Sequence, residues 1–252
     1  MGDFTRRFEV RIKARPTLIF GETLSVQKLF YLLFDSAEAD GTKLREALCG
    51  VAVPAMREAG AMEITVFGAD ADVAEGSPIR QVDPPIRAMV SFWLEDAGDR
   101  GSAEAALAGH VQGLAGYLVC ESRPMVHEMP KGERTPGMKQ ISCITKRADL
   151  SQEEYIRIWH GDHRQVAIDT QSTFGYVRNE IFRALTPGAP DRWDAFVEES
   201  FPMGALTDQE IFYDAKTHEE YETNFKIMMD SCGRFLDHSA IEVTFFSEYY
   251  MG

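Results

Sequence analysis

The fold is decided by residues 138–163, which read MKQISCITKRADLSQEEYIRIWHGDH. The first part of this stretch, Met138 to Arg147, is rich in the apolar residues of a buried strand. The next part opens with Ser151-x-x-Glu154, the capping-box pattern that starts a helix. The stretch therefore predicts a strand followed closely by a capped helix.

The residues after this stretch continue the same kind of pattern. Strands are predicted at Phe174 to Arg183 and at Trp193 to Phe201. A second capping box, Thr217-x-x-Glu220, opens another helix. An apolar stripe runs along that helix and consists of Tyr221, Phe225, Met228, Met229, Cys232 and Phe235. A last strand is predicted at Ile241 to Ser247, so the order from residue 137 onward is βαββαβ.

The first half of the chain predicts the same order of elements. The predicted strands are Val26 to Phe34, Met62 to Gly68, Ile86 to Glu95 and Gly116 to Arg123, and the predicted helices are Asp40 to Ala59 and Ser102 to Ala115. The two halves share few identical side chains, so the repeat is inferred from element order. We predict a diverged ferredoxin-like repeat at 1–125, a linker at 126–136 that contains proline and glycine, and a second ferredoxin-like repeat at 137–252.

A βαββαβ unit belongs to the α+β class. It forms an antiparallel sheet with both helices on one face and leaves the other face bare. Two such units in one chain can lay their bare faces together and form a barrel-like core. Any cavity would then lie between a sheet and its helices or between the two sheets.

Composition excludes several classes of protein. The 252 residues are 44% apolar and 26% charged, as in a folded globular protein, and the net charge of −14 argues against nucleic acid as a partner. No apolar stretch is long enough to cross a membrane, and no apolar segment follows the basic N-terminal residues. The four cysteines form no CxxC pair, which favours reduced thiols and a cytoplasmic location.

One histidine is a candidate for proton transfer. Helical spacing places His163 on the same face as Tyr155, Trp159 and Val166, and His160 on a flanking face. A partly buried histidine is well suited to move a proton near neutral pH, although a satisfied core histidine has the same pattern. Two histidines three residues apart lack a third ligand, so no metal site is predicted.

Strand alternation sorts the remaining candidates. Tyr176 and Arg178 share one face of their strand and Asn179 lies on the other, while Asp194 and Glu198 share a face of the next strand. A carboxyl group in an apolar interior must be paired, hydrogen-bonded or protonated. Glu198 is therefore a candidate acid or base, or else the partner of a cation such as Arg178. Arg178 could instead hold a substrate carboxylate.

These motifs resemble the EthD family of the dimeric α/β-barrel superfamily. The matching motifs are Lys146-Arg147, Leu150-Ser151-Gln-Glu153-Glu154-Tyr155, Trp159-x-x-x-His163, Tyr176-Val177-Arg178-Asn179 and Trp193-Asp194-Ala-Phe-Val-Glu198. The family usually has glycine where this chain has Ala195. The first half lacks the Trp-x-x-x-His signature, so its role is expected to be structural or substrate-shaping.

The resemblance implies small-molecule chemistry in a barrel cavity, and several superfamily members work without an organic cofactor. No glycine-rich phosphate loop or GxSxG elbow is present in the sequence. We therefore expect a cofactor-independent isomerase, cyclase or C–C lyase that acts by proton transfer on a small oxygenated, anionic compound, either an aromatic-catabolism intermediate or an unsaturated keto acid. The expected catalytic residues are His163, Glu198, Asp194 and Tyr176, and the expected substrate-binding residues are Arg178, Trp159, Asn179 and His160.

Two alternatives stay open at this point. The chain could be a non-catalytic protein that binds a small ligand or supports an assembly. It could also bind haem through His163 or His218, because tandem ferredoxin-like chains of this length include haem proteins. A homodimer is a further option, since unpaired sheet edges could join two copies.

Overall fold

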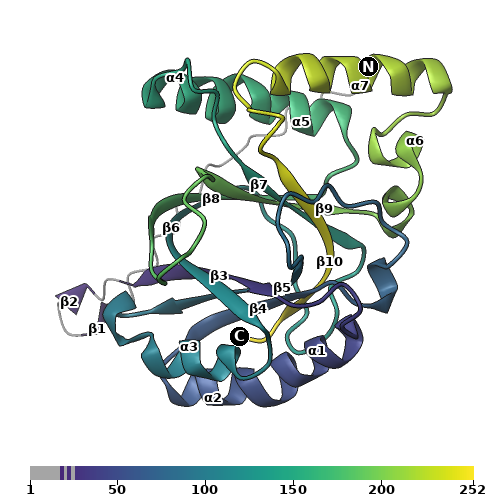
Figure 1. Ribbon diagram of the computed structural model, residues 1–252. Helices are drawn as coiled ribbons and strands as arrows, with labels where there is room; N and C mark the ends of the chain where they lie inside the picture. Colours follow the sequence, from purple (N-terminus) through teal and green to yellow (C-terminus); the bar gives the residue numbers. More distant parts are fainter. Residues whose placement is uncertain (1–17, 20–21, 24–25) are drawn as a thin grey trace.

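The protein forms a closed barrel of eight antiparallel strands with helices packed outside it (Figure 1). The computed structural model describes residues 18–19, 22–23 and 26–252. The first four barrel strands are β3 (Gln27–Phe34), β4 (Met62–Gly68), β5 (Ile86–Leu94) and β6 (Gly113–Met125). The second four are β7 (Met138–Ile144), β8 (Gly175–Ala184), β9 (Ala195–Phe201) and β10 (Glu242–Tyr250). A short pair, β1 (Leu18–Ile19) and β2 (Glu22–Thr23), precedes them.

Each half of the chain forms the same four-stranded sheet. The first half has the spatial order β4-β5-β3-β6, and the second has β8-β9-β7-β10. In both, the first strand of the repeat lies inside the sheet and the second lies at an edge. The α+β class and the two βαββαβ repeats are therefore confirmed. The boundaries at 1–125, 126–136 and 137–252 remain a proposal, and residues 126–137 connect β6 to β7.

The two sheets join through their edges. The β6 strand pairs with β8, and β10 pairs with β4, in both cases antiparallel. These two seams make one continuous barrel, because the edge strands of one repeat pair with the edge strands of the other.

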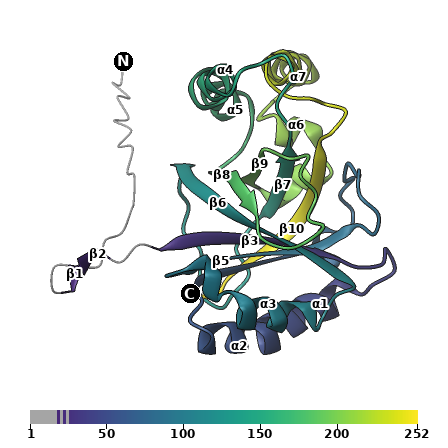
Figure 2. The ribbon, with the colours of Figure 1, turned by 60° about the vertical axis from the view of Figure 1, so that its left-hand side comes forward.

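The helices lie in two layers on opposite sides of the barrel (Figure 2). The first layer contains α1 (Gly41–Ala47), α2 (Val53–Glu58) and α3 (Gly101–Ala108), and the second contains α4 (Gln152–Ile156), α5 (Arg164–Thr170), α6 (Gln209–Phe212) and α7 (His218–Cys232). Short 3-10 turns occur at Ala71–Val73, Ala97–Asp99 and Met203–Leu206. A π-helical turn joins two helices in each layer, η1 (Leu48–Ala52) in the first and η4 (Arg157–His163) in the second. No helix of the described residues is long and apolar enough to cross a membrane.

Side-chain caps start the helices where the sequence predicts. The Asp40 side chain accepts hydrogen bonds from the backbone N–H groups of Thr42 and Lys43. Ser151 and Glu154 form both bonds of a capping box. These caps satisfy backbone donors that the first helical turn leaves without partners.

Several predicted boundaries are wrong, among them the start of β6, at Gly113 rather than Gly116, and the end of β7, at Ile144 rather than Arg147. The second helix of the first repeat ends at Ala108 rather than Ala115, because Gly109 ends it and β6 already begins at Gly113, opposite Phe34. The last strand continues to Tyr250, since its final residues pair with β4. The short helix α6 was not predicted.

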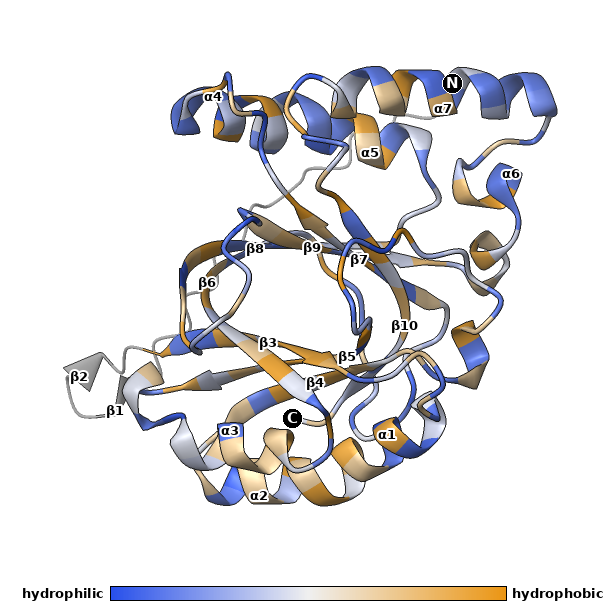
Figure 3. Cartoon of the chain, in the orientation of Figure 1, coloured by the Kyte–Doolittle hydropathy of each residue, from blue (hydrophilic) through white to orange (hydrophobic). Residues whose placement is uncertain are grey.

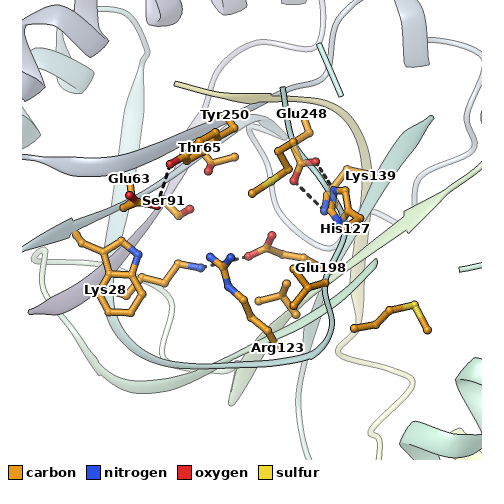
Figure 4. Close-up of a pocket in the computed structure, with 15 residues that line it drawn as sticks. Lys28, Glu63, Thr65, Ser91, Arg123, His127, Lys139, Glu198, Glu248 and Tyr250 are labelled. Carbon is orange, nitrogen blue, oxygen red and sulfur yellow. Dashed lines mark hydrogen bonds and ion pairs between the residues drawn. The ribbon is translucent and has the colours of Figure 1, made fainter. Parts of the chain in front are cut away.

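The barrel interior is aromatic at one end and charged at the other. Phe196 lies 5.0 Å from Phe30 and 5.1 Å from Tyr117 between ring centroids. At the charged end, Lys28 and Arg123 converge near Glu198, and Glu248 contacts Lys139 and His127 (Figure 4). Hydrophobic residues gather on the strands, whereas the outer sides of the helices are more hydrophilic (Figure 3).

Candidate functional site

A cavity of about 470 Å³ lies between the helix-facing side of the second sheet and the second helix layer. Its polar lining includes Gln140, Ser142, His163, Gln171, Tyr176, Glu199, Thr207, Gln209, Tyr213, Cys232 and His238. Apolar walls come from aromatic and methionine side chains, among them Trp159, Phe212, Phe235 and Met228. Apolar walls with a few polar groups are typical of small-molecule sites.

Comparison of corresponding side chains in the two repeats explains why the cavity forms in the second repeat and not in the first. When the repeats are aligned on their first strands and on the helix caps Asp40 and Ser151, Gln140 and Ser142 correspond to Leu29 and Tyr31. The strand registers extend this correspondence: Gln140 lies opposite Glu199 in the second sheet, and Leu29 lies opposite Phe92 in the first. Polar side chains in the second repeat thus replace large apolar ones in the first.

In the first repeat the corresponding space is filled. Tyr31 and Phe92 stack with ring centroids 5.6 Å apart, and the Tyr31 hydroxyl donates to Glu104 Oε2 at 2.9 Å. Gly116 lies opposite Tyr31, and a Cβ atom there would approach the Tyr31 ring to 2.5 Å. Ser142 has Val243 as its neighbour instead, so the second repeat has a smaller residue where the first has a ring.

Of the two carboxyl groups that line the cavity in the described part of the chain, that of Glu199 is buried and that of Glu75 is exposed. Gln140 Nε2 donates a hydrogen bond to Glu199 Oε2 at 3.2 Å. Burial raises the pKa of Glu199 to about 7, although Gln140 and the Lys139 ammonium act in the opposite direction. A carboxyl group with this pKa can take up or release a proton at neutral pH.

Tyr176 lies opposite Glu199 across the β8–β9 pair. Trp159 Nε1 donates a hydrogen bond to the Tyr176 hydroxyl oxygen at 3.0 Å, which fixes both rings. Burial, with the nearby Glu199 carboxylate, raises the pKa of Tyr176 well above its usual range. The Tyr176 hydroxyl therefore stays protonated at neutral pH and can donate a hydrogen bond to an oxygen atom of a ligand.

His163 completes the polar lining from the helix side. The π-helical turn η4 carries it inward, where Nδ1 lies 2.9 Å from Ser231 Oγ and the ring packs 4.7 Å from Phe235. Burial, together with the Arg234 guanidinium, lowers the pKa of His163 to about 4. The imidazole is therefore neutral at neutral pH.

The residues predicted from sequence are divided between two faces of the sheet. His163, Tyr176 and Trp159 line the cavity. Glu198 and Asn179 lie inside the barrel, where Asn179 Nδ2 donates to Glu198 Oε1 at 2.8 Å. Glu198, which the sequence predicted as a catalytic residue together with His163, therefore does not line the cavity, and Glu199, one residue later, points to the helix side.

Three further predicted residues do not line the cavity. Asp194 accepts a hydrogen bond from the backbone N–H of Lys146 at 2.7 Å and so holds the turn after β7. Arg178 lies behind Trp159, with its guanidinium 5.8 Å from the indole centroid. His160 Nε2 lies 3.4 Å from Glu180 Oε1.

The described residues contain neither a metal-binding group nor a cavity cysteine with a reactive thiol. Within the described residues, no group of three His, Cys, Asp or Glu side chains is arranged to hold a metal ion. All four cysteines are free thiols. Burial raises the pKa of the cavity residue Cys232 to about 12, so this thiol is protonated and a poor nucleophile.

Comparison with known proteins gives one family and a group of similar folds. No curated protein matches the chain. An anthrone oxidase-like protein of known structure has 10% identity and a TM-score of 0.48, with 92% of this chain and 95% of that chain covered. A mutant chlorite dismutase from Candidatus Nitrospira defluvii has 11% identity and a TM-score of 0.46, with 90% and 91% covered. Residues 147–239 match the family model of the EthD domain, in agreement with the resemblance of the Trp159-x-x-x-His163 motif to that family.

Proposed function

We propose that the protein is an enzyme that moves a proton on a small oxygenated molecule bound in the cavity of the second repeat. The observation that carries the proposal is Glu199, a buried carboxyl group with a pKa of about 7 in a cavity of about 470 Å³. Titratable groups with strongly perturbed pKa values gather at functional sites. The EthD match also suggests a protein that processes a small molecule.

The cavity residues divide the chemistry between them. The Glu199 carboxylate takes a proton from a carbon atom next to a carbonyl group, and the Tyr176 hydroxyl donates a hydrogen bond to the oxygen that becomes an enolate. Neutral His163 orients the substrate or passes a second proton. Return of the proton to a different carbon gives isomerisation, and this sequence of steps uses no organic cofactor.

The lining favours an uncharged substrate. Among the described residues that line the cavity there is no lysine or arginine. The anionic keto acid expected from the sequence relied on Arg178, which lies behind Trp159. A phenol, enone or similar aromatic-derived compound fits the aromatic and methionine walls better than a carboxylate does.

Proton exchange with solvent tests the proposal. We expect the protein to catalyse deuterium incorporation into a member of a panel of enolisable aromatic-derived carbonyl compounds. Glu199→Gln and His163→Ala should each reduce that rate by about 100-fold or more. The matched control is Glu198→Gln, which changes the neighbouring carboxyl group on the opposite face. Full activity of a folded Glu199→Gln protein would contradict the assignment.

Filling the cavity is a second test, and the first repeat supplies the design. The double change Ser142→Tyr and Val243→Gly copies the Tyr31 and Gly116 pair. We expect the ring to occupy the cavity and to abolish both turnover and ligand binding, as measured by calorimetry, with folding intact. Ser142→Ala is the control and should retain binding. Unchanged turnover in the double variant would place the reaction elsewhere.

The same measurements separate the alternatives. A compound that binds but never exchanges its protons would indicate a ligand-binding protein. An absorbance band at about 400 nm in the purified protein would indicate haem.

A further inference from the structure

Three buried polar atoms without hydrogen-bond partners lie outside the cavity lining, around the π-helical turn η4 and β8. They are His160 Nε2, Arg164 Nε and Arg178 Nη1. The pKa of His160 is lowered to about 4 by burial and by the charges of Arg178 and Arg164, so these three side chains lie near one another. Buried polar groups in proteins are normally paired, and three exceptions in one place indicate a missing partner.

The cluster carries two arginines without a carboxylate partner. Among the described residues, no carboxylate lies within ion-pair distance of Arg178 or Arg164, and Glu180, the acid of this cluster, contacts His160 instead. Arg178 is only 7% exposed. Glu180 acts on Arg178 only from beyond ion-pair distance, and a buried cation without a carboxylate in direct contact is costly. In a chain with a net charge of −14, which has acidic side chains in excess, an unpaired buried arginine is unexpected.

The guanidinium of Arg178 is held in a fixed orientation. Its Nε donates to Ser122 Oγ at 2.9 Å, and one face of the group lies over the Trp159 ring. These contacts leave Nη1 free. A planar guanidinium fixed in this way is suited to bind two oxygen atoms of a carboxylate or phosphate.

We propose that this cluster is a binding site for an oxyanion, a carboxylate or phosphate group, held by Arg178 and Arg164. Trp159 separates the site from the cavity, because its ring meets Arg178 and its Nε1 donates to Tyr176. The site rests on the unpaired arginines and does not depend on the proposed reaction.

Titration with inorganic phosphate and with acetate, at constant ionic strength, tests the site. We expect at least one of these anions to bind in calorimetry and to raise the melting temperature by a few degrees, since a ligand of the folded state stabilises it. Arg178→Gln should weaken binding by about 10-fold or more, as expected for the loss of a charge-assisted bidentate contact. Arg164→Gln, a change at a half-buried residue, gives a second variant in case Arg178→Gln does not fold.

The control is Arg147→Gln, which removes an exposed cation that pairs with Asp149. Binding that is lost in the Arg178 and Arg164 variants and kept in the control supports the site. A response to phosphate alone would identify a phosphate group as the ligand, and a response to acetate would include carboxylates. No binding of either anion, or equal binding in all variants, would overturn the proposal and mean that water satisfies the arginines.

Discussion

Lys28→Met should reduce the free energy of unfolding by about 3–5 kcal/mol, the cost typical of removing one partner of a buried ion pair. Lys28 is 4% exposed, and its Nζ lies 2.5 Å from Glu121 Oε2, 2.8 Å from Asn179 Oδ1 and 3.4 Å from Glu198 Oε1. Methionine fills a similar volume but leaves both carboxylates without this cation. Urea unfolding at neutral pH measures the difference.

An exposed lysine provides the comparison. Lys226 pairs with Asp230 on α7 and its side chain is 74% exposed, so Lys226→Met should change stability very little. Adding Glu198→Gln to Lys28→Met should restore part of the loss, because one of the unpaired charges is removed. Equal stability of Lys28→Met and Lys226→Met would show that water reaches the barrel interior and solvates the carboxylates.

Glu199→Gln should remove a pH dependence of stability that the native protein shows between about pH 4.5 and pH 7. Burial raises the pKa of Glu199 from 4.5 in the unfolded chain to about 7 in the folded protein. Between these values the unfolded chain has lost its proton and the folded protein still holds one, so the stability supplied by this group falls as pH rises. The loss amounts to at most about 3 kcal/mol, at 1.36 kcal/mol for each pKa unit.

Denaturant unfolding at a series of pH values measures this slope. In Glu199→Gln the slope from this group disappears, and the variant should be more stable than the native protein at about pH 8. Glu248 gives an internal reference, because contacts with Lys139 and His127 lower its pKa to about 2. The contribution of Glu248 to the free energy of unfolding is lost as pH falls from 4.5 through 2. This loss of stability at low pH should persist in Glu199→Gln. Identical slopes in both proteins above pH 4.5 would contradict the raised pKa of Glu199.

Much of the fold could be predicted because local signals agreed with it. Asp40 and Ser151-x-x-Glu154 are strong helix starts, and the strand at Met62–Gly68 has the predicted bounds. The barrel-like core was predicted from the bare sheet faces, but the strand pairs that close it, such as β6 with β8, could not be, because the paired strands lie far apart in the chain. Non-local pairing leaves no local sequence signal.

The helix residues of the candidate site could be predicted from the sequence, whereas its acidic strand residue could not. Helical spacing correctly grouped Trp159 and His163, since the capping box fixes the phase of that helix. Strand alternation groups residues of one face but does not say which face meets the helices. Phe196 shares its face with Glu198, and this face turned out to meet the barrel interior, so of the two neighbouring glutamates it is Glu199 that lines the cavity. Neighbouring glutamates in a strand fully buried on both sides carry no signal that distinguishes them.

Closure of the barrel by β10 has a consequence for how the chain folds during synthesis. The β4 strand has an unpaired edge until Glu242–Tyr250 leaves the ribosome, because those residues are its partner. While the second repeat is being synthesised, the first repeat therefore exposes the β4 edge and an apolar sheet face. A chain in this state is prone to aggregation. The charged residues inside the barrel, Lys28 among them, lie on that exposed face and interrupt its apolar surface.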